Sequence, residues 1–408
     1  MNVLFSAPYG PNLIRVRPYN LIRELTLLGH RVTVATVWTD ESESRDVENL
    51  KEHCEQVLAE PISRGRSAWN CLQALPTRVP LQAVYSWLPS LERRVQELIA
   101  SPNGRQPFDV IHVEHLRGAR YGGGARSAMA GSQAIPIVWD SVDCISYLFR
   151  QASEQSGKLL SRLITRFELG RTEEYEAWLL GQFDRVLVTS EIDRKALSAL
   201  EAPDGNGSAI SVLPNGVDLE YFKPDPGLER EPATVVMTGK MSYHANVSMC
   251  LYFAREVLPL VHRSRPDVKL MVVGKDPARE VRELAAHPMI EVTGTVEDLR
   301  PYLRRATVAV APVTYGAGIQ NKVLEAMACG APVVSSPQAV SALDLRVGEE
   351  ALVADKPEAF AASILSLIED PRRRLHIGEA GRRYVARHHA WSAIARHLEE
   401  DYSAAIGV

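Results

Sequence analysis

The sequence of 408 residues predicts an α/β protein with two domains, each built around a parallel β-sheet flanked by helices. The first observation behind this prediction is that short apolar runs alternate with longer segments whose apolar residues recur at helical spacing. The second is that this alternation occurs twice, on either side of a charged linker that contains Pro224 and Pro226. We therefore predict a first domain over residues 1–225, a second over residues 226–387, and a C-terminal helix over residues 388–408.

The first domain opens with the order strand, helix, strand. Val3–Ala7 is a short apolar run that predicts a buried strand, and a helix follows between Pro18 and Gly29. Between about residues 40 and 105 the pattern does not order the elements. The other predicted elements of this domain are strands at Arg31–Val37, Val110–Val113, Ile135–Trp139, Arg185–Val188 and Ile210–Leu213, and helices at Leu159–Leu180 and Asp193–Leu200.

The second domain repeats the alternation more regularly. Parallel sheets of this kind bind ligands beyond the carboxyl ends of their strands, so the loops that follow the strands are the expected site. The chain then closes with an amphipathic segment, Trp391–Ile406, whose apolar face we expect to pack on the first domain. The strands predicted for the second domain are Thr234–Thr238, Val268–Val273, Ile290–Thr293, Val308–Ala311 and Pro332–Ser335.

Composition excludes several classes of protein. Hydrophobic residues make up 46% of the chain and charged residues 24%, which argues against extensive disorder. The net charge of -4 argues against a nucleic-acid binder. Five cysteines without CxxC spacing argue against a zinc ribbon or a disulfide scaffold. With neither a signal peptide nor an apolar run of membrane-spanning length, the sequence predicts a cytoplasmic protein.

The densest motif lies between two strands of the second domain. The strand Val308–Ala311 leads into a loop with Gly316 and Gly318, and a helix follows. Glycines let phosphates approach the backbone, and a helix start offers free N–H groups. Asn321 replaces the third glycine of the dinucleotide fingerprint, which argues against a nicotinamide-dependent dehydrogenase.

This motif resembles a known family signature. The run Gly-Ala-Gly-Ile-Gln-Asn-Lys-Val-Leu-Glu-Ala-Met-Ala-Cys-Gly-Ala-Pro-Val-Val (316–334) is similar to the nucleotide-binding signature of the family 4 retaining glycosyltransferases. Val212–Phe222 and Gly29–Val34 resemble two further segments of that family, and the resemblance spans nearly the whole chain. It implies the GT-B architecture, in which two Rossmann-like domains face a cleft and a C-terminal helix crosses back to the first domain. The implied activity is transfer of a sugar from a nucleotide-sugar donor to an acceptor hydroxyl, with no metal and no cofactor.

The resemblance assigns donor-binding residues in the second domain. Glu325 matches the second carboxylate of the family's paired-glutamate motif, which accepts hydrogen bonds from the ribose hydroxyls; the alternative is an ordinary first-turn glutamate. The first carboxylate would fall on Ala317 and is absent, as in the glycine-rich-loop variants. The backbone at Gly318, Ile319 and Gln320 is therefore expected to contact the donor sugar.

A lysine is expected to meet the donor diphosphate. Gly239 and Lys240 resemble the family's Gly-Arg pair, so that Lys240 would stabilise charge on the leaving group as a catalytic residue. The family's second basic position falls on Ala245, and Lys322 is a candidate to replace it. For both lysines the alternative is a surface position. Thr293 and Val296 match the loop whose backbone contacts the nucleobase.

The first domain supplies the other candidate catalytic residues. Glu114 and His115 end a predicted strand, where the family carries a histidine that contacts the donor sugar. Either residue is a candidate, and the alternative is a strand-end pair with a structural role. A zinc site is disfavoured because no third ligand stands at a fixed spacing.

Four charged residues are candidates for binding the acceptor. Asp140 and Asp143 follow a predicted strand, and the alternative is a helix cap. Arg15 and Arg17 follow the first strand; they bind an anionic acceptor or remain solvated. The chain contains no DxD triplet, which agrees with a metal-independent enzyme.

The segment Pro61–Trp87 combines arginines with Trp69 and Trp87. Such a stretch is typical of peripheral contact with an anionic membrane, here at its inner face. Packing of an irregular loop on its own domain is the interpretation we favour from sequence alone.

The implied pathway is the synthesis of a polysaccharide, glycolipid or glycoconjugate, and the acceptor is a saccharide, a lipid-linked group or a small molecule. Two other functions remain open. A nucleotide-sugar epimerase on the same fold would use Glu114, His115 and Asp143 as acid and base. A non-catalytic nucleotide-sugar sensor would explain the missing glutamate at Ala317.

Overall fold

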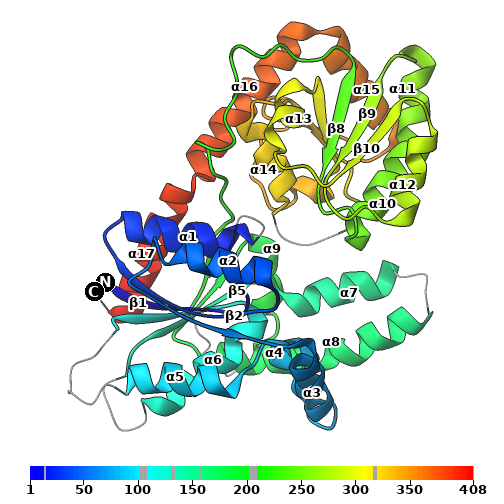
Figure 1. Ribbon diagram of the computed structural model, residues 1–408. Coiled ribbons are helices and arrows are strands. Elements are labelled where there is room, and N and C mark those ends of the chain that lie inside the picture. Colours follow the sequence, from blue (N-terminus) through cyan, green and yellow to red (C-terminus); the bar gives the residue numbers. More distant parts are fainter. Residues whose placement is uncertain are drawn as a thin grey trace. The chain divides into compact units, whose positions relative to one another are not determined.

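A computed structural model of the chain describes residues 1–12, 15–100, 108–129, 134–155, 159–201, 209–315 and 319–407 (Figure 1). The chain forms two compact units. Unit 1 comprises Met1–Pro214 together with Trp391–Val408, and unit 2 comprises Asn215–Ala390. None of the helices in the described part of the chain combines the length and apolar content that crossing a membrane requires.

The division between the units follows Pro214 and therefore precedes the linker near residue 225 that the sequence suggested. The reason is that the segment after Pro214 is held by the end of unit 2. The Val217 N–H donates a hydrogen bond of 2.7 Å to the His389 carbonyl, and Val217 forms a bridge with Ala390. Phe222 packs against the core of unit 2.

Unit 1 contains one parallel sheet of seven strands in the order β3-β2-β1-β4-β5-β6-β7. The order reverses between β1 and β4, so the carboxyl ends of these two strands mark the expected binding edge. The strands are β1 (Asn2–Ala7), β2 (Arg31–Trp38), β3 (Gln56–Pro61), β4 (Val110–Glu114), β5 (Ile137–Val142), β6 (Arg185–Val188) and β7 (Ala209–Val212). The helices are α1 (Val16–Leu27), α2 (Glu41–Leu50), α3 (Arg64–Ala74), α4 (Leu81–Tyr85), α5 (Pro89–Ile99), α6 (His115–Ala128), α7 (Ile145–Gln155), α8 (Leu159–Leu180), α9 (Glu191–Ser198) and α17 (Trp391–Ile406).

Unit 2 contains a parallel sheet of six strands in the order β10-β9-β8-β11-β12-β13, with the reversal between β8 and β11. The strands are β8 (Thr234–Thr238), β9 (Lys269–Val273), β10 (Ile290–Gly294), β11 (Val308–Ala311), β12 (Val333–Ser335) and β13 (Leu352–Val353). The helices are α10 (His244–Tyr252), α11 (Leu258–Ser264), α12 (Arg279–Arg282), α13 (Arg300–Arg305), α14 (Asn321–Ala328), α15 (Pro357–Glu369) and α16 (Pro371–His388).

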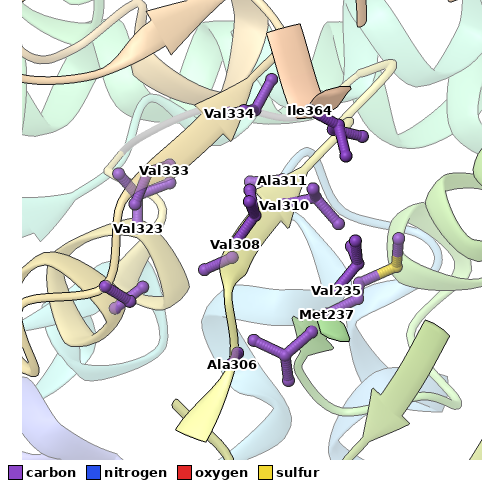
Figure 2. Close-up of a cluster of buried hydrophobic side chains, with 14 of the residues drawn as sticks. Val235, Met237, Ala306, Val308, Val310, Ala311, Val323, Val333, Val334 and Ile364 are labelled. Carbon is purple, nitrogen blue, oxygen red and sulfur yellow. The ribbon is translucent and has the colours of Figure 1, made fainter. Parts of the chain in front are cut away.

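Strands β8, β11 and β12 of unit 2 are buried on both faces because helices cover the sheet from both sides. Figure 2 shows side chains of β8, β11 and β12 meeting in this core, including Val235, Val308 and Val333. Ile364 of α15 and Val323 of α14 pack into the same cluster. This packing fixes α14, and with it the residues that follow the glycine loop.

The C-terminal helix α17 belongs to unit 1, as predicted. It packs against α1, β4 and β5, and Figure 1 shows it beside α1. Trp391, Ile394, Leu398 and Tyr402 are each no more than 3% exposed. The predicted apolar face is therefore the face that is buried, and the predicted fold class of two Rossmann-like α/β domains with a returning helix is confirmed.

Two parts of the pattern differ from the prediction. The stretch from about residue 40 to 105 contains α2, β3, α3, α4 and α5, which the sequence did not order, and β3 is a sheet-edge strand with only one fully buried residue. Strand β5 runs to Val142 instead of ending at Trp139, so Asp140 lies inside the strand. A register shift between Asp140 and Val142 accompanies this extension.

Candidate functional site

The binding edge of unit 1 carries two buried carboxylates side by side. Glu114 is the last residue of β4 and lies opposite Asp140 of β5 in the strand register. Their exposed fractions are 1% and 0%. Burial of two acidic groups at adjacent positions is unfavourable unless one is paired and the other is neutral.

Asp140 is the paired carboxylate. Its Oδ2 accepts a hydrogen bond of 2.8 Å from Nε of Arg17 and lies 2.8 Å from Nη2 in the same ion pair, while its Oδ1 accepts a hydrogen bond of 3.1 Å from the Val142 N–H. Arg17 is itself 4% exposed and also donates to the Pro214 carbonyl at 3.3 Å. The sequence left open that Arg17 is solvated and that Asp140 caps a helix. Both alternatives are wrong, because Arg17 and Asp140 form an internal ion pair.

Glu114 is the neutral carboxyl group. Its Oε1 accepts a hydrogen bond of 3.1 Å from the Tyr9 hydroxyl, and its buried Oε2 has no partner among the described residues. Burial, aided by the charge of Asp140, raises the pKa of Glu114 to about 8. At neutral pH this carboxyl group therefore keeps its proton.

His115, the residue after Glu114, is also uncharged. It begins α6 with a φ of 62°, a left-handed conformation that costs a non-glycine residue roughly 1–2 kcal/mol. Its Nδ1 accepts a hydrogen bond of 3.2 Å from the Arg117 N–H, and burial together with the charge of Arg117 lowers its pKa to about 3. The ring is therefore neutral with its proton on Nε2. His115 is half-buried, whereas Glu114 is enclosed.

The other two predicted acceptor residues are less enclosed. Asp143 is half-buried; burial, with a contribution from Asp193, raises its pKa to about 7, and it accepts a hydrogen bond of 3.3 Å from Thr189. Arg15 forms a 2.7 Å ion pair with Glu43 of α2. The Arg15 side chain therefore points to α2. Of the four predicted acceptor residues, only Arg17, Asp140 and Asp143 lie at the edge formed by β4 and β5.

The carboxylate cluster includes two residues, His112 and Tyr402, that were not among the predicted site residues. His112 of β4 stacks on Phe5, and its Nδ1 lies 3.0 Å from the Tyr402 hydroxyl of α17. Its Nε2 lies 3.8 Å from Asp140 Oδ2, and burial lowers its pKa to about 4. A buried tyrosine hydroxyl needs a hydrogen-bond partner. Tyr402 on the predicted apolar face was therefore the one residue in the sequence that indicated a buried polar contact of α17.

We expect Glu114→Gln to change how stability depends on pH. Because the pKa of Glu114 is raised to about 8 from 4.5, the unfolded chain releases this proton first, and stability falls as pH rises from about 4.5 to 8. The glutamine variant lacks this contribution, so its free energy of unfolding should decline less steeply, by about 1 kcal/mol per pH unit. Urea unfolding at pH 5, 6, 7 and 8 measures the two slopes, and parallel slopes would show that Glu114 is ionised in the folded protein.

In unit 2 the binding edge is formed by the ends of β8 and β9 and the start of α14. Two glycines close the first two strands, Gly239 with a φ of 152° and Gly274 with a φ of 149°. A Cβ on Gly274 would lie 1.8 Å from the Gly239 carbonyl oxygen, so the backbones touch here and no side chain fits. Gly274 is thus structural, and Lys240, which follows Gly239, is exposed.

Lys322 joins α14 to the loop that contains Lys240. Its Nζ donates to Asn246 Oδ1 at 2.9 Å and to Gln320 Oε1 at 3.2 Å. Asn246 in turn donates from Nδ2 to the Lys240 carbonyl at 3.0 Å. Burial lowers the pKa of Lys322 to about 8, partly offset by the charge of Glu325. Lys322 is not a plain surface lysine, and Asn246 was not indicated by the sequence.

Glu325 lies one turn beyond Lys322 on α14. It is partly buried, and no described residue donates a hydrogen bond to its carboxylate. The loss of solvation raises its pKa to about 7, and the positive charge of Lys322 opposes this effect. The arrangement is a cation and a carboxylate on one helix face, neither of them neutralised by a direct ion pair.

The remaining predicted donor residues surround this helix start or lie on the neighbouring loop. Gln320 occupies the N-cap position of α14 without a side-chain capping hydrogen bond, and Ile319 is 7% exposed. Gly316, Ala317 and Gly318 lie outside the described residues. Thr293 and Val296 are partly buried on either side of Gly294, and Val296 lines a cavity of about 400 Å³ with Asp298 and Tyr302.

An aromatic pair that the sequence did not indicate precedes the glycine loop. His244 begins α10, and its ring stacks on Tyr315 with the centroids 5.4 Å apart. The His244 Nδ1 and the Tyr315 hydroxyl are 2.6 Å apart. Within the described ranges, no group of three His, Cys, Asp or Glu residues is placed to hold a metal ion, and all five cysteines are free thiols.

Two family models match the chain, one over most of unit 1 and the other over most of unit 2. Residues 15–221 match the family described as Glycosyltransferase Family 4, and residues 232–370 match the one described as Glycosyl transferases group 1. The chain is 26% identical over 253 residues to a D-inositol 3-phosphate glycosyltransferase of Segniliparus rotundus, which covers 57% of this chain and 54% of that protein.

A second relative is a GDP-mannose-dependent alpha-(1-6)-phosphatidylinositol monomannoside mannosyltransferase of Mycolicibacterium smegmatis. It is 27% identical over 238 residues, which cover 52% of this chain and 61% of the relative. The matched segments thus span little more than half the length of these two relatives.

Solved structures show that the whole fold is shared. Sucrose-phosphate synthase from Thermosynechococcus elongatus superposes with a TM-score of 0.67 at 20% identity and 98% coverage of both chains. The Anabaena protein HepE in complex with UDP-glucose superposes with a TM-score of 0.67 at 14% identity, covering 99% of this chain and 100% of that chain. The fold is GT-B, and since one family description matches half of the chain, this protein belongs to glycosyltransferase family 4.

Proposed function

We propose that this protein is a retaining glycosyltransferase that moves a sugar from a nucleotide-sugar donor to an acceptor hydroxyl. The observation that carries the proposal is the start of α14, where Lys322 and Glu325 lie one turn apart after a glycine loop. A cation beside a helix N-terminus suits a diphosphate, and a nearby carboxylate suits the vicinal hydroxyls of a ribose.

In this proposal unit 2 binds the donor. Lys322, together with Lys240, stabilises the negative charge that develops on the diphosphate, and Glu325 accepts hydrogen bonds from the ribose hydroxyls. The backbone at Gly316, Gly318, Ile319 and Gln320 contacts the sugar, and the backbone around Thr293 and Val296 contacts the base. The names of the M. smegmatis relative and of HepE support a nucleoside diphosphate sugar as donor.

Unit 1 binds the acceptor. His115 offers its Nε2–H as a hydrogen-bond donor to a hydroxyl of the donor sugar, and the enclosed Glu114 acts beside it through Tyr9, whose hydroxyl it holds. Asp143 is the least enclosed carboxylate for an acceptor group. Arg17 and Asp140 hold this edge in shape through their ion pair. The inositol and phosphatidylinositol acceptors in the names of the two relatives favour a saccharide or lipid-linked acceptor, in glycolipid or polysaccharide synthesis at the cytoplasmic face of a membrane.

In the proposed reaction the bond from the anomeric carbon to the diphosphate oxygen breaks, and a bond from that carbon to the acceptor oxygen forms on the same face. The acceptor proton passes to the departing diphosphate. Neither of the two adjacent carboxylates at the ends of β4 and β5 stands ready as a nucleophile, since Asp140 is ion-paired and Glu114 is protonated. Catalysis then consists of leaving-group stabilisation and positioning of the acceptor, and no cofactor takes part.

The test is incubation with a panel of nucleoside diphosphate sugars and hydroxyl acceptors. A transferase releases nucleoside diphosphate and a glycosylated acceptor. An epimerised donor would identify an epimerase instead, and binding without turnover would identify a sensor.

We expect the turnover to survive chelation. Lysines take the place of a metal ion in neutralising the diphosphate, so an excess of EDTA should leave the initial rate within about twofold of the untreated rate. The measurement is product formation with and without EDTA. Loss of activity that Mg²⁺ or Mn²⁺ restores would contradict the metal-independent mechanism.

A further inference from the structure

Helix α3 of unit 1 exposes its large apolar side chains and buries small and polar ones. Its buried positions are Ser67, Asn70 and Ala74, which are polar or small. Its exposed positions include Trp69 at 51% and Leu72 at 55%. A surface helix normally turns its apolar stripe inward, so this helix presents its apolar stripe to the outside.

Polar contacts hold α3 in this orientation. Asn70 donates from Nδ2 to the carbonyls of Val84 at 3.0 Å and Trp87 at 2.7 Å. At its C-terminal end, Arg171 of α8 donates to the carbonyls of Ala74 and Thr77 at 2.6 and 2.8 Å. The apolar residues therefore do not hold the helix in place, and their exposure is a fixed property of the fold.

The apolar surface continues beyond α3. Leu75, just after the helix, is 46% exposed, and Phe167 of α8, next to Arg171, is 51% exposed. We call Trp69, Leu72, Leu75 and Phe167 the α3 face. Figure 1 shows α3 beside α4 and α8. Clustered exposed apolar residues of this size mark an interaction surface.

The charge around the α3 face identifies the partner. Residues 61–91 contain Arg64, Arg66 and Arg78 but no aspartate and no glutamate. Of these three arginines, only Arg78 forms an ion pair with a described residue. It lies 3.2 Å from Glu174, and both groups are exposed. Arg66 lies over the Trp87 ring at 5.6 Å. Tryptophan and leucine flanked by arginine are suited to the boundary between headgroups and acyl chains of an anionic bilayer.

A second copy of the chain fits this charge less well. In a two-fold symmetric dimer the same patch meets itself. Arg64 and Arg66 would then face their own copies with no carboxylate from residues 61–91 between them. We propose that the α3 face docks the protein on an anionic lipid surface, through Trp69, Leu72, Leu75 and Phe167 inserted at the headgroup level and the arginines on lipid phosphates. This proposal does not depend on the transfer reaction.

Vesicle sedimentation of the full chain tests the proposal. We expect binding to vesicles of phosphatidylcholine mixed with phosphatidylglycerol, little binding to phosphatidylcholine alone, and weaker binding at high salt. Trp69→Ser with Leu72→Ser should weaken binding about tenfold or more. Leu27→Ser with Leu375→Ser is the matched control, since these leucines are exposed elsewhere at 73% and 63%.

A second pair of variants tests the charge. Arg64→Gln with Arg78→Gln should weaken binding to the anionic vesicles about tenfold, whereas Arg372→Gln with Arg373→Gln, exposed on α16, should not. Circular dichroism confirms that each variant is folded. Equal binding by the wild type and the Trp69/Leu72 variant, or no binding to anionic vesicles, would overturn the proposal. So would a concentration-dependent dimer that this variant abolishes, since the face would then belong to a second copy.

Discussion

Ending the chain at Ala390 is expected to unfold unit 1. The deletion removes α17 and with it Trp391, Ile394, Leu398 and Tyr402, all of which pack in the core between α1 and the sheet. Losing large buried side chains costs about 2–5 kcal/mol each, and the sum is comparable to the whole stability of a typical domain. The deletion also removes the Tyr402 partner of His112 and the Asp401 partner of Arg185, the latter 2.6 Å apart.

Thermal unfolding and limited proteolysis measure this effect. The truncated protein should lose its cooperative transition for unit 1 or aggregate on expression, and proteases should cut within residues 1–214. A chain that ends at Ala404 is the control, because it keeps every fully buried residue of α17. If the chain ending at Ala390 melts at the same temperature as the full-length protein, α17 is not part of the core of unit 1.

Glu325→Ala is expected to weaken nucleotide-sugar binding by thirtyfold to hundredfold, about 2–3 kcal/mol, because hydrogen bonds to a charged acceptor are the strong ones. No described residue pairs with this carboxylate, so the alanine variant leaves no protein donor unsatisfied. Calorimetric titration with the donor measures the change, and Glu379→Ala on α16 serves as a control. Unchanged affinity would remove Glu325 from the donor site.

The same titration should depend on pH in a defined way. Burial raises the pKa of Glu325 to about 7 and lowers that of Lys322 to about 8. If the ionised carboxylate and the ionised lysine both bind the donor, affinity rises through pH 7 and falls above pH 8. Lys322→Met should remove the fall above pH 8 and move the rise to higher pH, since the charge of Lys322 lowers the pKa of Glu325. A flat profile in the wild type would contradict both roles.

The structure also shows why some features could be predicted and others could not. The strand β11 and the position of Glu325 on α14 follow from local signals, namely an apolar run, glycines and helical spacing. The strand β8 was predicted to the residue because burial on both faces makes its sequence continuously apolar. The edge strand β3 escaped prediction because only one of its residues is fully buried.

Long-range polar pairs were beyond sequence reasoning for a different reason. The Arg17–Asp140 pair joins residues 123 positions apart, and the Tyr402–His112 contact joins residues 290 positions apart. Neither has a local pattern, since an ion pair of this kind depends only on which strand ends meet. The same holds for the Lys322–Asn246 bond, which spans 76 positions. Sequence located the candidate groups, and the fold decided which of them are paired.

Transfer of a sugar with retention of its anomeric configuration is the reaction proposed for this protein. Proton NMR of the reaction during the first turnovers follows the anomeric proton of the donor and that of the product together. We predict that the donor signal declines as a new glycoside of the same anomeric configuration appears, with an equal amount of nucleoside diphosphate. A product of the opposite configuration, or a donor converted to its epimer with no glycoside formed, would contradict the account.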